Sequence, residues 1–351
     1  MILFQNDYNQ ACHPQVLKKI TDFAFTPMPG YGEDPICEHA SALIKKLCGD
    51  ENLSVHFLVG GTQTNLTVIA AALKPYQAVI APSSGHISEH ETGAIEATGH
   101  KIIELPSNDG KLCPDQIEQV MQNHFAGNGP GREHTPQPKM VYISDSTEYG
   151  TVYSLQELED LGAVCKKYGL YLFLDGARLG YALMAKENDA SIADIARICD
   201  VFYIGGTKVG TMFGEAVVIR NNVLAEDFRY MIKQRGGMLA KGWLLGLQFE
   251  ALFENGLYFD ICREANQLAD LIRTTLVQLD YPLTVDCGTN QVFTVMPNSV
   301  LDALAKEFVF TEMGRVDENH RTVRFCTSWS TTREQVDTLC RKLQELSNYF
   351  F

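Results

Sequence analysis

The sequence predicts an α/β protein with a large domain built on a mostly parallel sheet and a small α+β domain at its C-terminal end. Three observations predict this class. Between residues 54 and 214, short apolar runs alternate with helical patterns, as they do in βαβ units. From about residue 224 helical patterns dominate, and the tail then mixes short strands with amphipathic helices. The length of 351 residues suits two domains better than a single hydrophobic core.

Strands of a parallel sheet are buried on both faces, so they are expected as continuous apolar runs. Such runs occupy 55–59, 78–81, 101–105, 140–144, 171–174, 201–204 and 215–219. Helical spacing of apolar residues marks 66–73, 155–168, 192–198, 243–253, 265–279, 299–308 and 333–350. Two further strands are expected over 291–296 and 322–326, and a Gly/Pro-rich loop over 127–138. We place the domain boundary so that residues 1–245 form the large domain and 246–351 the small one.

Composition and charge argue against several classes of function. The chain is 45% hydrophobic and 21% charged, as soluble globular proteins are, and no apolar run reaches membrane-spanning length. A net charge of -14 with scattered Lys and Arg argues against nucleic acid as a partner. The ten cysteines form no C-x-x-C pair, so we expect no bound metal. The start shows no signal or transit pattern, which predicts a cytoplasmic protein.

Two charged residues stand where buried strands are expected to end. Asp175 follows the apolar run 170–174, and Lys208 follows the run 201–207. Their separation of 33 residues matches one βαβ crossover of about 30 residues or more. Both side chains are then expected at the edge where open parallel sheets bind their ligands. From this geometry alone, a structural ion pair and a catalytic site are equally good interpretations.

Pyridoxal 5'-phosphate would explain both charges at once. The amine of Lys208 would form a Schiff base with the cofactor's aldehyde, and the carboxylate of Asp175 would keep the pyridine nitrogen protonated. A phosphate cradle is also available, because the sequence 57–65 (FLVGGTQTN) runs from a strand through two glycines into a helix. Thr62 or Thr64 would cap that helix. A plain loop with a capping threonine remains an alternative interpretation of this segment.

His86 follows the expected strand 78–81 and would therefore lie at the same edge of the sheet. Its imidazole would stack on a cofactor ring. A solvated loop histidine is the alternative interpretation.

These motifs together resemble the threonine aldolase and β-eliminating lyase family of fold-type I pyridoxal-phosphate enzymes. The resemblance covers most of the chain and keeps the family's order. The matching strings are Y-G-E-D-P at 31–35, G-G-T at 60–62, H-I-x-x-x-E-x-G-A from residue 86, L-D-G-A-R-L at 174–179, T-K at 207–208 and R-G-G-M at 235–238. The resemblance implies an aspartate aminotransferase-like large domain, pyridoxal phosphate as the cofactor and a small-molecule amino acid as the substrate.

The resemblance also implies roles for single residues. It gives Lys208 the covalent bond to the cofactor, Asp175 the pyridine nitrogen and His86 the stacking on the ring. The phosphate is bound by Gly61 and Thr62. Arg178 would lie near the cofactor's phenolic oxygen and the substrate carboxylate, and Arg324 would clamp that carboxylate, since a guanidinium fork matches two oxygens. The family forms homodimers or homotetramers with shared active sites, so Tyr31 and Arg235 would serve the site of a neighbouring subunit.

The sequence departs from the family pattern on the substrate side. Where the family commonly has E-N-T-H-N, residues 145–149 read D-S-T-E-Y, so Glu148 replaces a histidine expected at the substrate hydroxyl. The N-terminal S-D-T string appears as Asn6, Asp7 and Tyr8, which places Asn6 where a group near the substrate carboxylate is expected. The usual T-H-x-D string appears as T-S-W-S at 327–330. The cofactor side is therefore intact and the substrate side is altered.

The sequence predicts cleavage of a β-hydroxy-α-amino acid such as threonine or allo-threonine to glycine and an aldehyde. The base that takes the hydroxyl proton would be Glu148, His86 or a bound water. Two alternatives remain open at this point. One is β-elimination on another amino acid with the same cofactor, and the other is a non-catalytic α/β binding protein in which Asp175 and Lys208 form only a salt bridge.

Overall fold

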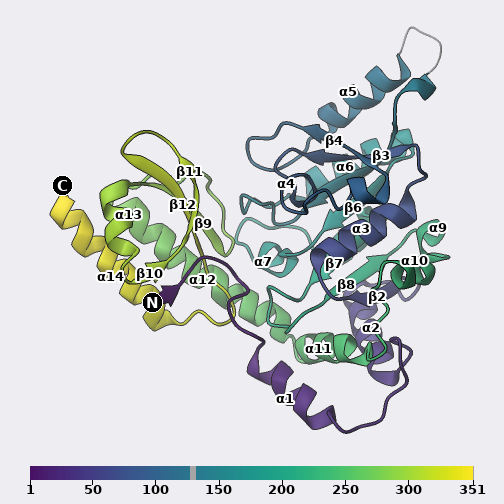
Figure 1. Cartoon of the computed structure of the whole chain (residues 1–351), viewed down its shortest axis with the longest axis horizontal. Coiled ribbons are helices and arrows are strands. Elements are labelled where there is room, and N and C mark those ends of the chain that lie inside the picture. The colour runs from purple at the N-terminus through teal and green to yellow at the C-terminus, as the bar shows by residue number, and fades with distance from the viewer. Residues whose placement is uncertain (127–131, 351) are drawn as a thin grey trace.

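A seven-stranded sheet forms the centre of the larger lobe in the computed structural model, which describes residues 1–126 and 132–350 (Figure 1). Its strand order is β2-β8-β7-β6-β5-β3-β4. The strands are β2 (Ser54–Leu58), β3 (Gln77–Pro82), β4 (Lys101–Leu105), β5 (Gln137–Ser144), β6 (Tyr171–Asp175), β7 (Val201–Gly205) and β8 (Glu215–Ile219). Only β8 runs antiparallel to its neighbours, because the connection 206–214 is too short for a crossover helix. The mostly parallel sheet is confirmed.

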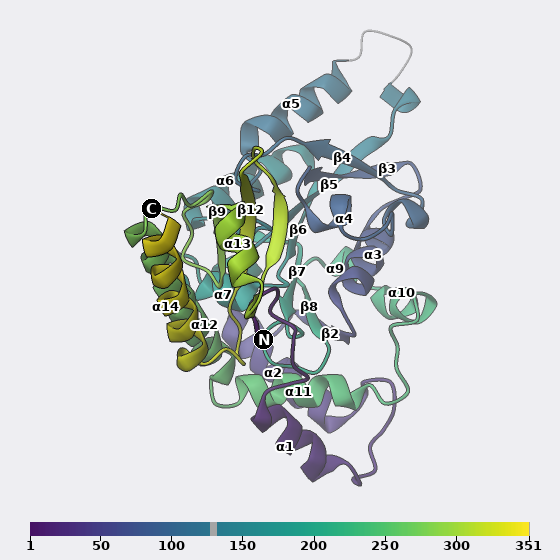
Figure 2. The same ribbon diagram turned by 60° about the vertical axis from the view of Figure 1, so that its left-hand side comes forward.

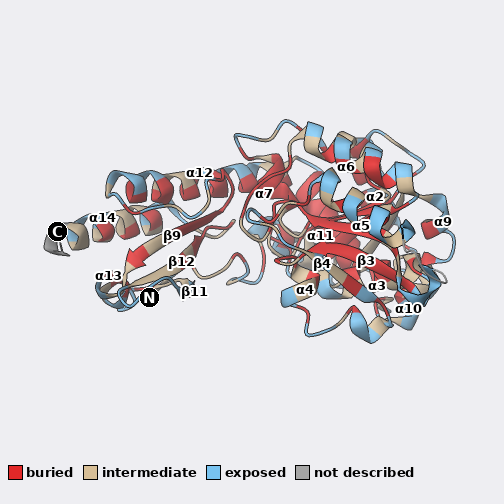
Figure 3. Ribbon diagram, turned by 90° about the horizontal axis from the view of Figure 1, so that it is seen from above, coloured by how far each residue is buried: buried red, intermediate tan, exposed pale blue. Residues whose placement is uncertain are grey.

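Helices cover both faces of this sheet, and Figure 3 shows its buried strands between them. One face packs against α3 and α10, and the other against α2, α5, α6, α8 and α11. The helices of this lobe are α1 (Pro14–Phe23), α2 (Pro35–Cys48), α3 (Gly61–Ala72), α4 (His86–Glu89), α5 (Pro114–Phe125), α6 (Leu155–Tyr168), α7 (Leu179–Leu183), α8 (Ile192–Ile198), α9 (Asn222–Ala225), α10 (Phe228–Gln234) and α11 (Trp243–Phe253), with short 3₁₀ turns at Glu96–Thr98 and Arg132–His134.

A three-stranded antiparallel sheet, in the order β11-β12-β9, forms the smaller lobe, and its core also takes side chains from α12 (Leu257–Gln278), α13 and α14 (Figure 2). Its elements are β9 (Gln291–Pro297), α13 (Asn298–Leu304), β10 (Phe308–Val309), β11 (Thr311–Arg315), β12 (His320–Cys326) and α14 (Arg333–Phe350). The N-terminal strand β1 (Ile2–Leu3) pairs with β10, so the start of the chain lies on this lobe. The division at residue 245 stays a prediction.

The long helix α12 (Leu257–Gln278) joins the two lobes. Its first turns pack into the core of the large lobe through Ile261 and Ala265, and its later turns pack into the core of the small lobe through Ile272 and Leu276. Because one helix packs into both cores, it fixes the position of one lobe relative to the other. This relative position matters because the candidate site takes side chains from both lobes.

Several element boundaries agree with the sequence, including 155–168 for α6, where Ser154 and Glu157 form a capping box. The helix after the glycine turn differs, because α3 begins at Gly61 and not at residue 66. Its N-cap is Gly60, and no side chain caps it, so the expected threonine caps are wrong. Part of the expected loop 127–138 lies outside the described residues. In the described part of the chain, no helix is long and apolar enough to span a bilayer.

Candidate active site

A cavity of about 1130 Å³ opens at the carboxyl edge of the large sheet and is lined by both lobes. The structure brings most of the expected site residues to its wall: Gly61, Thr62, His86, Glu148, Asp175, Arg178, Lys208 and Arg324. They come from strand ends, loops and the first turns of α3 and α4 in the large lobe, except Arg324, which lies on β12. Asn6 and Tyr31 do not line this cavity.

Asp175 ends β6 and is 3% exposed, yet it accepts four hydrogen bonds. Its Oδ2 accepts from Tyr142 Oη at 2.6 Å and Asn65 Nδ2 at 3.0 Å. Its Oδ1 accepts from the Tyr203 hydroxyl and from the Ala177 N–H at 3.0 Å. Burial alone would raise the pKa of Asp175, but the His86 charge and these donors outweigh burial and lower the pKa. Asp175 is therefore held as an anion.

Glycine next to Asp175 allows the ends of β6 and β7 to approach closely. A Cβ on Gly176 would lie 1.8 Å from the Tyr203 carbonyl oxygen, and a Cβ on Gly205 would lie 2.3 Å from the Ala177 carbonyl oxygen. Side chains at either position would push the strands apart. The glycines therefore let Tyr203 reach the Asp175 carboxylate.

Lys208 lies in the loop after β7, where Tyr181 Oη donates to its carbonyl oxygen at 2.6 Å. Among the described residues, its amine makes no hydrogen bond and no ion pair within 4 Å. Burial, and next the charge of Arg178, lower the pKa of Lys208. A lysine without a fixed partner and with a lowered pKa is suited to act as a nucleophile.

His86 begins α4 and is connected to Asp175 through two buried side chains. His86 Nδ1 lies 2.8 Å from Glu91 Oε1, which also accepts from Asn65 Nδ2 at 2.7 Å. The same Asn65 amide donates to Asp175. Because Glu91 is 5% exposed and points one oxygen at the ring, it fixes the orientation of the imidazole on the cavity wall.

Gly61 and Thr62 form the first turn of α3, at the cavity wall. The first N–H groups of a helix have no partner within it, and the helix dipole favours an anion there. A Cβ on Gly61 would lie 3.1 Å from Tyr203 Oη, so glycine also keeps this turn close to the Asp175 cluster. The turn is thus a suitable place for a phosphate group.

Arg178 is held by Asp7, a residue whose role the sequence did not reveal. Its Nε and Nη2 donate to the two Asp7 oxygens at 2.7 and 3.0 Å, and Asn290 Nδ2 donates to Asp7 at 3.0 Å. Burial opposes the ionisation of Asp7, but the Arg178 charge and these hydrogen bonds lower its pKa to about 2. The pair fixes the N-terminal segment to the cavity floor and leaves Arg178 Nη1 without a hydrogen bond among the described residues.

Arg324 and Glu148 each combine fixed contacts with one unused buried atom. Arg324 Nη1 donates to Gln291 Oε1 at 3.0 Å and Nη2 to the Gln5 carbonyl at 3.0 Å, while Nε has no partner. Glu148 Oε1 accepts from the backbone N–H of His86 at 2.9 Å and from Ser144 Oγ at 2.8 Å, while Oε2 has no partner among the described residues. Burial, and then the Asp175 charge, raise the pKa of Glu148. Both unused atoms are available to a ligand.

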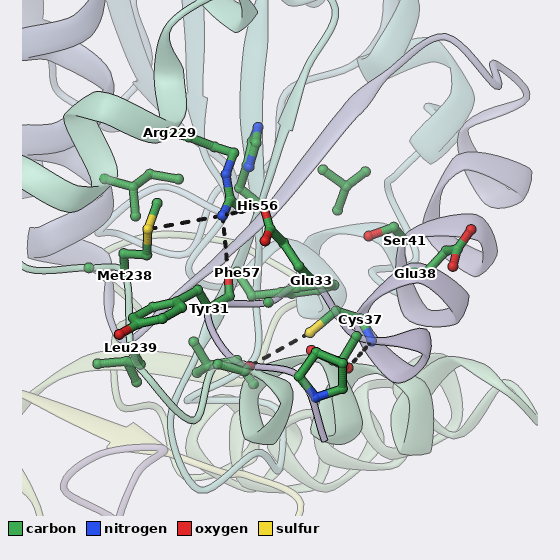
Figure 4. A pocket seen from close by; sticks show the side chains of 18 of the residues that line it. Tyr31, Glu33, Cys37, Glu38, Ser41, His56, Phe57, Arg229, Met238 and Leu239 are labelled. Carbon is green, nitrogen blue, oxygen red and sulfur yellow. Dashed lines mark hydrogen bonds and ion pairs between the residues drawn. The ribbon is translucent and has the colours of Figure 1, made fainter. Parts of the chain in front are cut away.

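Two expected site residues lie elsewhere. Asn6 Oδ1 accepts the N–H of Tyr8 in a local turn, and it is Tyr8 that lines the cavity. Tyr31 lines a second cavity of about 550 Å³ between α2, β2 and α10, which Figure 4 shows. Tyr31 is 47% exposed and has a left-handed φ of 64°, a conformation that aromatic residues rarely adopt. The roles of Asn6 and Tyr31 in substrate binding stay predictions.

The residues on the main cavity fit pyridoxal phosphate. The anionic Asp175 suits a protonated pyridine nitrogen, and the free amine of Lys208 suits an aldehyde. The imidazole of His86 offers a flat surface, and the first turn of α3 offers donors for a phosphate. The volume is of the size that encloses a cofactor with a small substrate.

Sequence reasoning missed two acids at this site. Asp7 lies in the N-terminal segment, and nothing near it in the sequence predicts the pairing with Arg178, 171 residues away. Glu215 is 3% exposed and also lines the cavity. The sequence does contain a sign of it, because Glu215 comes directly before the apolar run 216–219, just as Asp175 comes directly after the run 170–174. Only if β8 is known to be antiparallel does this position fall at the carboxyl edge of the sheet.

Comparisons with known proteins agree with this geometry. Residues 28–299 match the β-eliminating lyase family. A low specificity L-threonine aldolase from Pseudomonas sp. (strain NCIMB 10558) is 30% identical over 325 residues, covering 90% of this chain and 89% of the relative. The structure of a Leishmania major threonine aldolase is 44% identical with a TM-score of 0.96, covering 99% of this chain and 100% of that one.

A more distant comparison shows the fold alone. An aspartate aminotransferase from Thermus thermophilus is 15% identical with a TM-score of 0.71, covering 99% of this chain and 91% of that one. The expected aspartate aminotransferase-like fold is therefore confirmed. The chain belongs to the β-eliminating lyase family, and it is a pyridoxal-phosphate-dependent lyase of fold type I.

Proposed function

We propose that this enzyme cleaves β-hydroxy-α-amino acids of the threonine or allo-threonine type to glycine and an aldehyde. The observation that carries the proposal is the single cavity that joins Lys208 and Asp175 to Glu148 and Arg324. The low specificity L-threonine aldolases and the Leishmania major threonine aldolase to which the chain is similar support the same reaction.

The cofactor would be held by residues of the large lobe. Lys208 would bind it covalently, Asp175 would accept the hydrogen of its ring nitrogen, and His86 would pack on its ring. Gly61 and Thr62 would donate to its phosphate. When bound, pyridoxal phosphate withdraws electrons from the bonds of the substrate α-carbon. The hydrogen bonds that Asp175 accepts keep it ionised, which is the state this contact requires.

The substrate carboxylate would be bound by Arg324 and by the free Nη1 of Arg178. Arg324 carries an unused buried Nε, and an anion there would satisfy it. Each guanidinium has one nitrogen without a hydrogen bond among the described residues, so we assign both arginines a share of the binding energy. The side chain of Tyr8 would close the cavity at the position where Asn6 was expected.

Glu148 would take the proton from the substrate β-hydroxyl. Its Oε1 is fixed by His86 and Ser144, while its Oε2 is buried and has no partner, so a hydroxyl hydrogen can bind there. The base acts in its ionised form. Burial raises the pKa of Glu148. As the pH is lowered, the rate of cleavage is therefore expected to begin to fall at a higher pH than it would with a glutamate of ordinary pKa.

Glu148→Gln tests this assignment. We expect cleavage to slow by about 10²-fold to 10⁴-fold and the acid limb of the pH profile to disappear. The absorbance change on adding glycine should persist, because glycine has no β-hydroxyl. Glu89→Gln, at the rim of the same cavity, is the control with the same loss of charge and should keep its activity. A Glu148→Gln enzyme that keeps the acid limb would point instead to His86.

Product analysis separates aldol cleavage from β-elimination. With threonine or allo-threonine, aldol cleavage releases glycine and acetaldehyde, whereas elimination releases a keto acid and ammonia. We expect glycine in amounts equal to the aldehyde. A keto acid without glycine would contradict the proposed reaction while leaving the cofactor site intact.

We further propose a homodimer or homotetramer, as the resemblance to the family implies, in which a neighbour completes each site. Tyr31 and Arg235 do not line the cavity of their own chain. Arg235 carries a buried Nε without a partner, and Tyr31 is exposed with an unfavourable backbone angle, as residues with a binding role often are. A cytoplasmic location is proposed as well, because all ten cysteines are free thiols.

Mixed oligomers test the shared site. Lys208→Ala and Arg235→Ala are each expected to be nearly inactive alone. Mixing them after mild dissociation should restore activity, because some hybrid sites take both wild-type residues. Mixing Lys208→Ala with Asp175→Ala is the control, since both residues lie on one chain's own cavity and complementation should then fail to appear. Failure of the first mixture to gain activity would contradict the shared site.

A further inference from the structure

Glu215 is a buried acid on the cavity wall that the roles above leave unused. It is the first residue of β8 and is 3% exposed. Because β8 is antiparallel, it starts at the edge where β7 ends, and Glu215 is the register partner of Gly205. Lys208 follows β7 by three residues, so the acid and the amine face the same cavity from neighbouring strand ends.

The contacts of Glu215 fix its carboxylate below this loop. Its Oε2 accepts the N–H of Gly206 at 2.9 Å. Gly206 and Thr207 are further tied to Gly214, whose carbonyl accepts the N–H groups of both at 3.0 and 3.1 Å. The two ends of the loop that contains Lys208 are therefore hydrogen-bonded to each other beside Glu215. The Glu215 carboxylate therefore binds the backbone of the loop 206–214 and places a negative charge on the same side of the cavity as the Lys208 amine.

We propose that Glu215 accepts the proton that the Lys208 ammonium must lose before its amine can react with an aldehyde. The proton leaves Lys208 Nζ and reaches the Glu215 carboxylate through one intervening water, which is regenerated, because the two side chains form no ion pair within 4 Å in the described part of the chain. Glu215 thus acts through Lys208 and is a positioning residue rather than one that touches the substrate. The inference rests on Lys208 as the reactive amine of the proposed function, and it does not depend on the substrate.

Electrostatics support a shared proton. Burial raises the pKa of Glu215 to about 7, while burial, and next Arg178, lower the pKa of Lys208. The two values approach each other because burial favours the neutral forms of both groups. Asp175 is an unsuitable acceptor, since the His86 charge and the hydrogen bonds to its carboxylate outweigh burial and keep its pKa low.

The other groups that face the pair act in known directions. The charge of Asp175 raises the pKa of Glu215, and Asp7 and Asp175 both raise the pKa of Lys208. The Tyr203 and Tyr258 hydroxyls also lie in the field of Glu215, and burial first of all raises the pKa of each, so both stay neutral. Glu215 and Lys208 are therefore the two groups at this edge whose pKa values burial moves toward each other.

The test measures the protonation of Lys208 in the full chain freed of cofactor. Trace labelling with acetic anhydride across the pH range, followed by mass spectrometry of the Lys208 peptide, gives the fraction of free amine. The Glu215 anion raises the pKa of Lys208, so Glu215→Gln should move the labelling curve to lower pH. Glu250→Gln removes a carboxylate that is 8% exposed outside the cavity and should leave the curve unchanged.

The outcomes are distinguishable from a failure of the proposed reaction, because labelling reports on the amine even if glycine is never released. Superimposable curves for wild type and Glu215→Gln would overturn the proposal, and so would an equal displacement in Glu250→Gln. If Glu215→Gln does not fold, Lys208→Met replaces it. Removal of the cation should raise the pH at which the infrared band of protonated carboxyl groups disappears. An unchanged band would overturn the proposal.

Discussion

The two sides of the cavity are built in different ways. On the cofactor side, Asp175 and Lys208 follow adjacent strands of one sheet, and the hydrogen bonds of Asp175 come from the same lobe. On the substrate side, Asp7 pairs with Arg178 across 171 residues and with Asn290 across 283 residues. The difference shows that one side depends on the topology of a sheet, whereas the other depends on how the lobes and the N-terminal segment meet.

The largest effect should come from the cofactor side. Lys208→Ala removes the amine that would bind the cofactor covalently, so we expect activity to fall by at least about 10³-fold. The purified variant should lack the absorbance that borohydride reduction removes from the wild type. The fold should survive, because the amine makes no hydrogen bond or ion pair to the described residues. A yellow, borohydride-sensitive Lys208→Ala protein would show that another lysine holds the cofactor.

The substrate side should respond through stability as much as through activity. Asp7→Asn leaves the Arg178 guanidinium buried without its partner, and breaking a buried pair costs about 3–5 kcal/mol of unfolding free energy. Urea denaturation measures this. Asn6→Ala is the neighbouring control and should change the free energy by no more than about 0.5 kcal/mol, since its side chain makes only a local turn.

The pH dependence of that loss has a defined sign. The pKa of Asp7 is about 2 in the folded protein, against an ordinary value of 3.8. The contribution of Asp7 to the free energy of unfolding is therefore fully present above pH 3.8. It is lost as the pH falls through about 2. The difference in stability between wild type and Asp7→Asn should therefore be constant near neutral pH and shrink in acid. A difference that grows in acid would contradict the pairing.

The same contrast explains what the sequence could predict. The positions of Asp175, Lys208 and His86 follow from strand ends, because parallel strands bring their carboxyl ends to one edge. Glu215 was missed because a short connection reverses β8, and apolar runs carry no information on strand direction. Asp7 was missed because its pairing needs the N-terminal segment to start on the small lobe and run to the large one, which no local pattern encodes.

The altered strings on the substrate side also gain physical meaning from the fold. Glu148 stands where the family commonly has a histidine, and it accepts a hydrogen bond from the backbone N–H of His86. A carboxylate in this place therefore has two contacts to satisfy, with His86 and Ser144, and keeps one oxygen for a ligand. In the proposed reaction the exchange would preserve a proton acceptor at the cavity wall, and the raised pKa of Glu148 would change the pH at which this acceptor works.

The smallest effect should come from the phosphate turn. Thr62 would add one hydroxyl to the backbone donors of α3, and those donors remain when it is replaced. Thr62→Ala should therefore weaken cofactor binding by only about 1 kcal/mol, or about fivefold, as measured by the dissociation of pyridoxal phosphate during dialysis. Thr62→Ser keeps the hydroxyl and should bind as the wild type does. If both variants lose the cofactor equally, the methyl group and not the hydroxyl matters, and the phosphate then relies on the helix terminus alone.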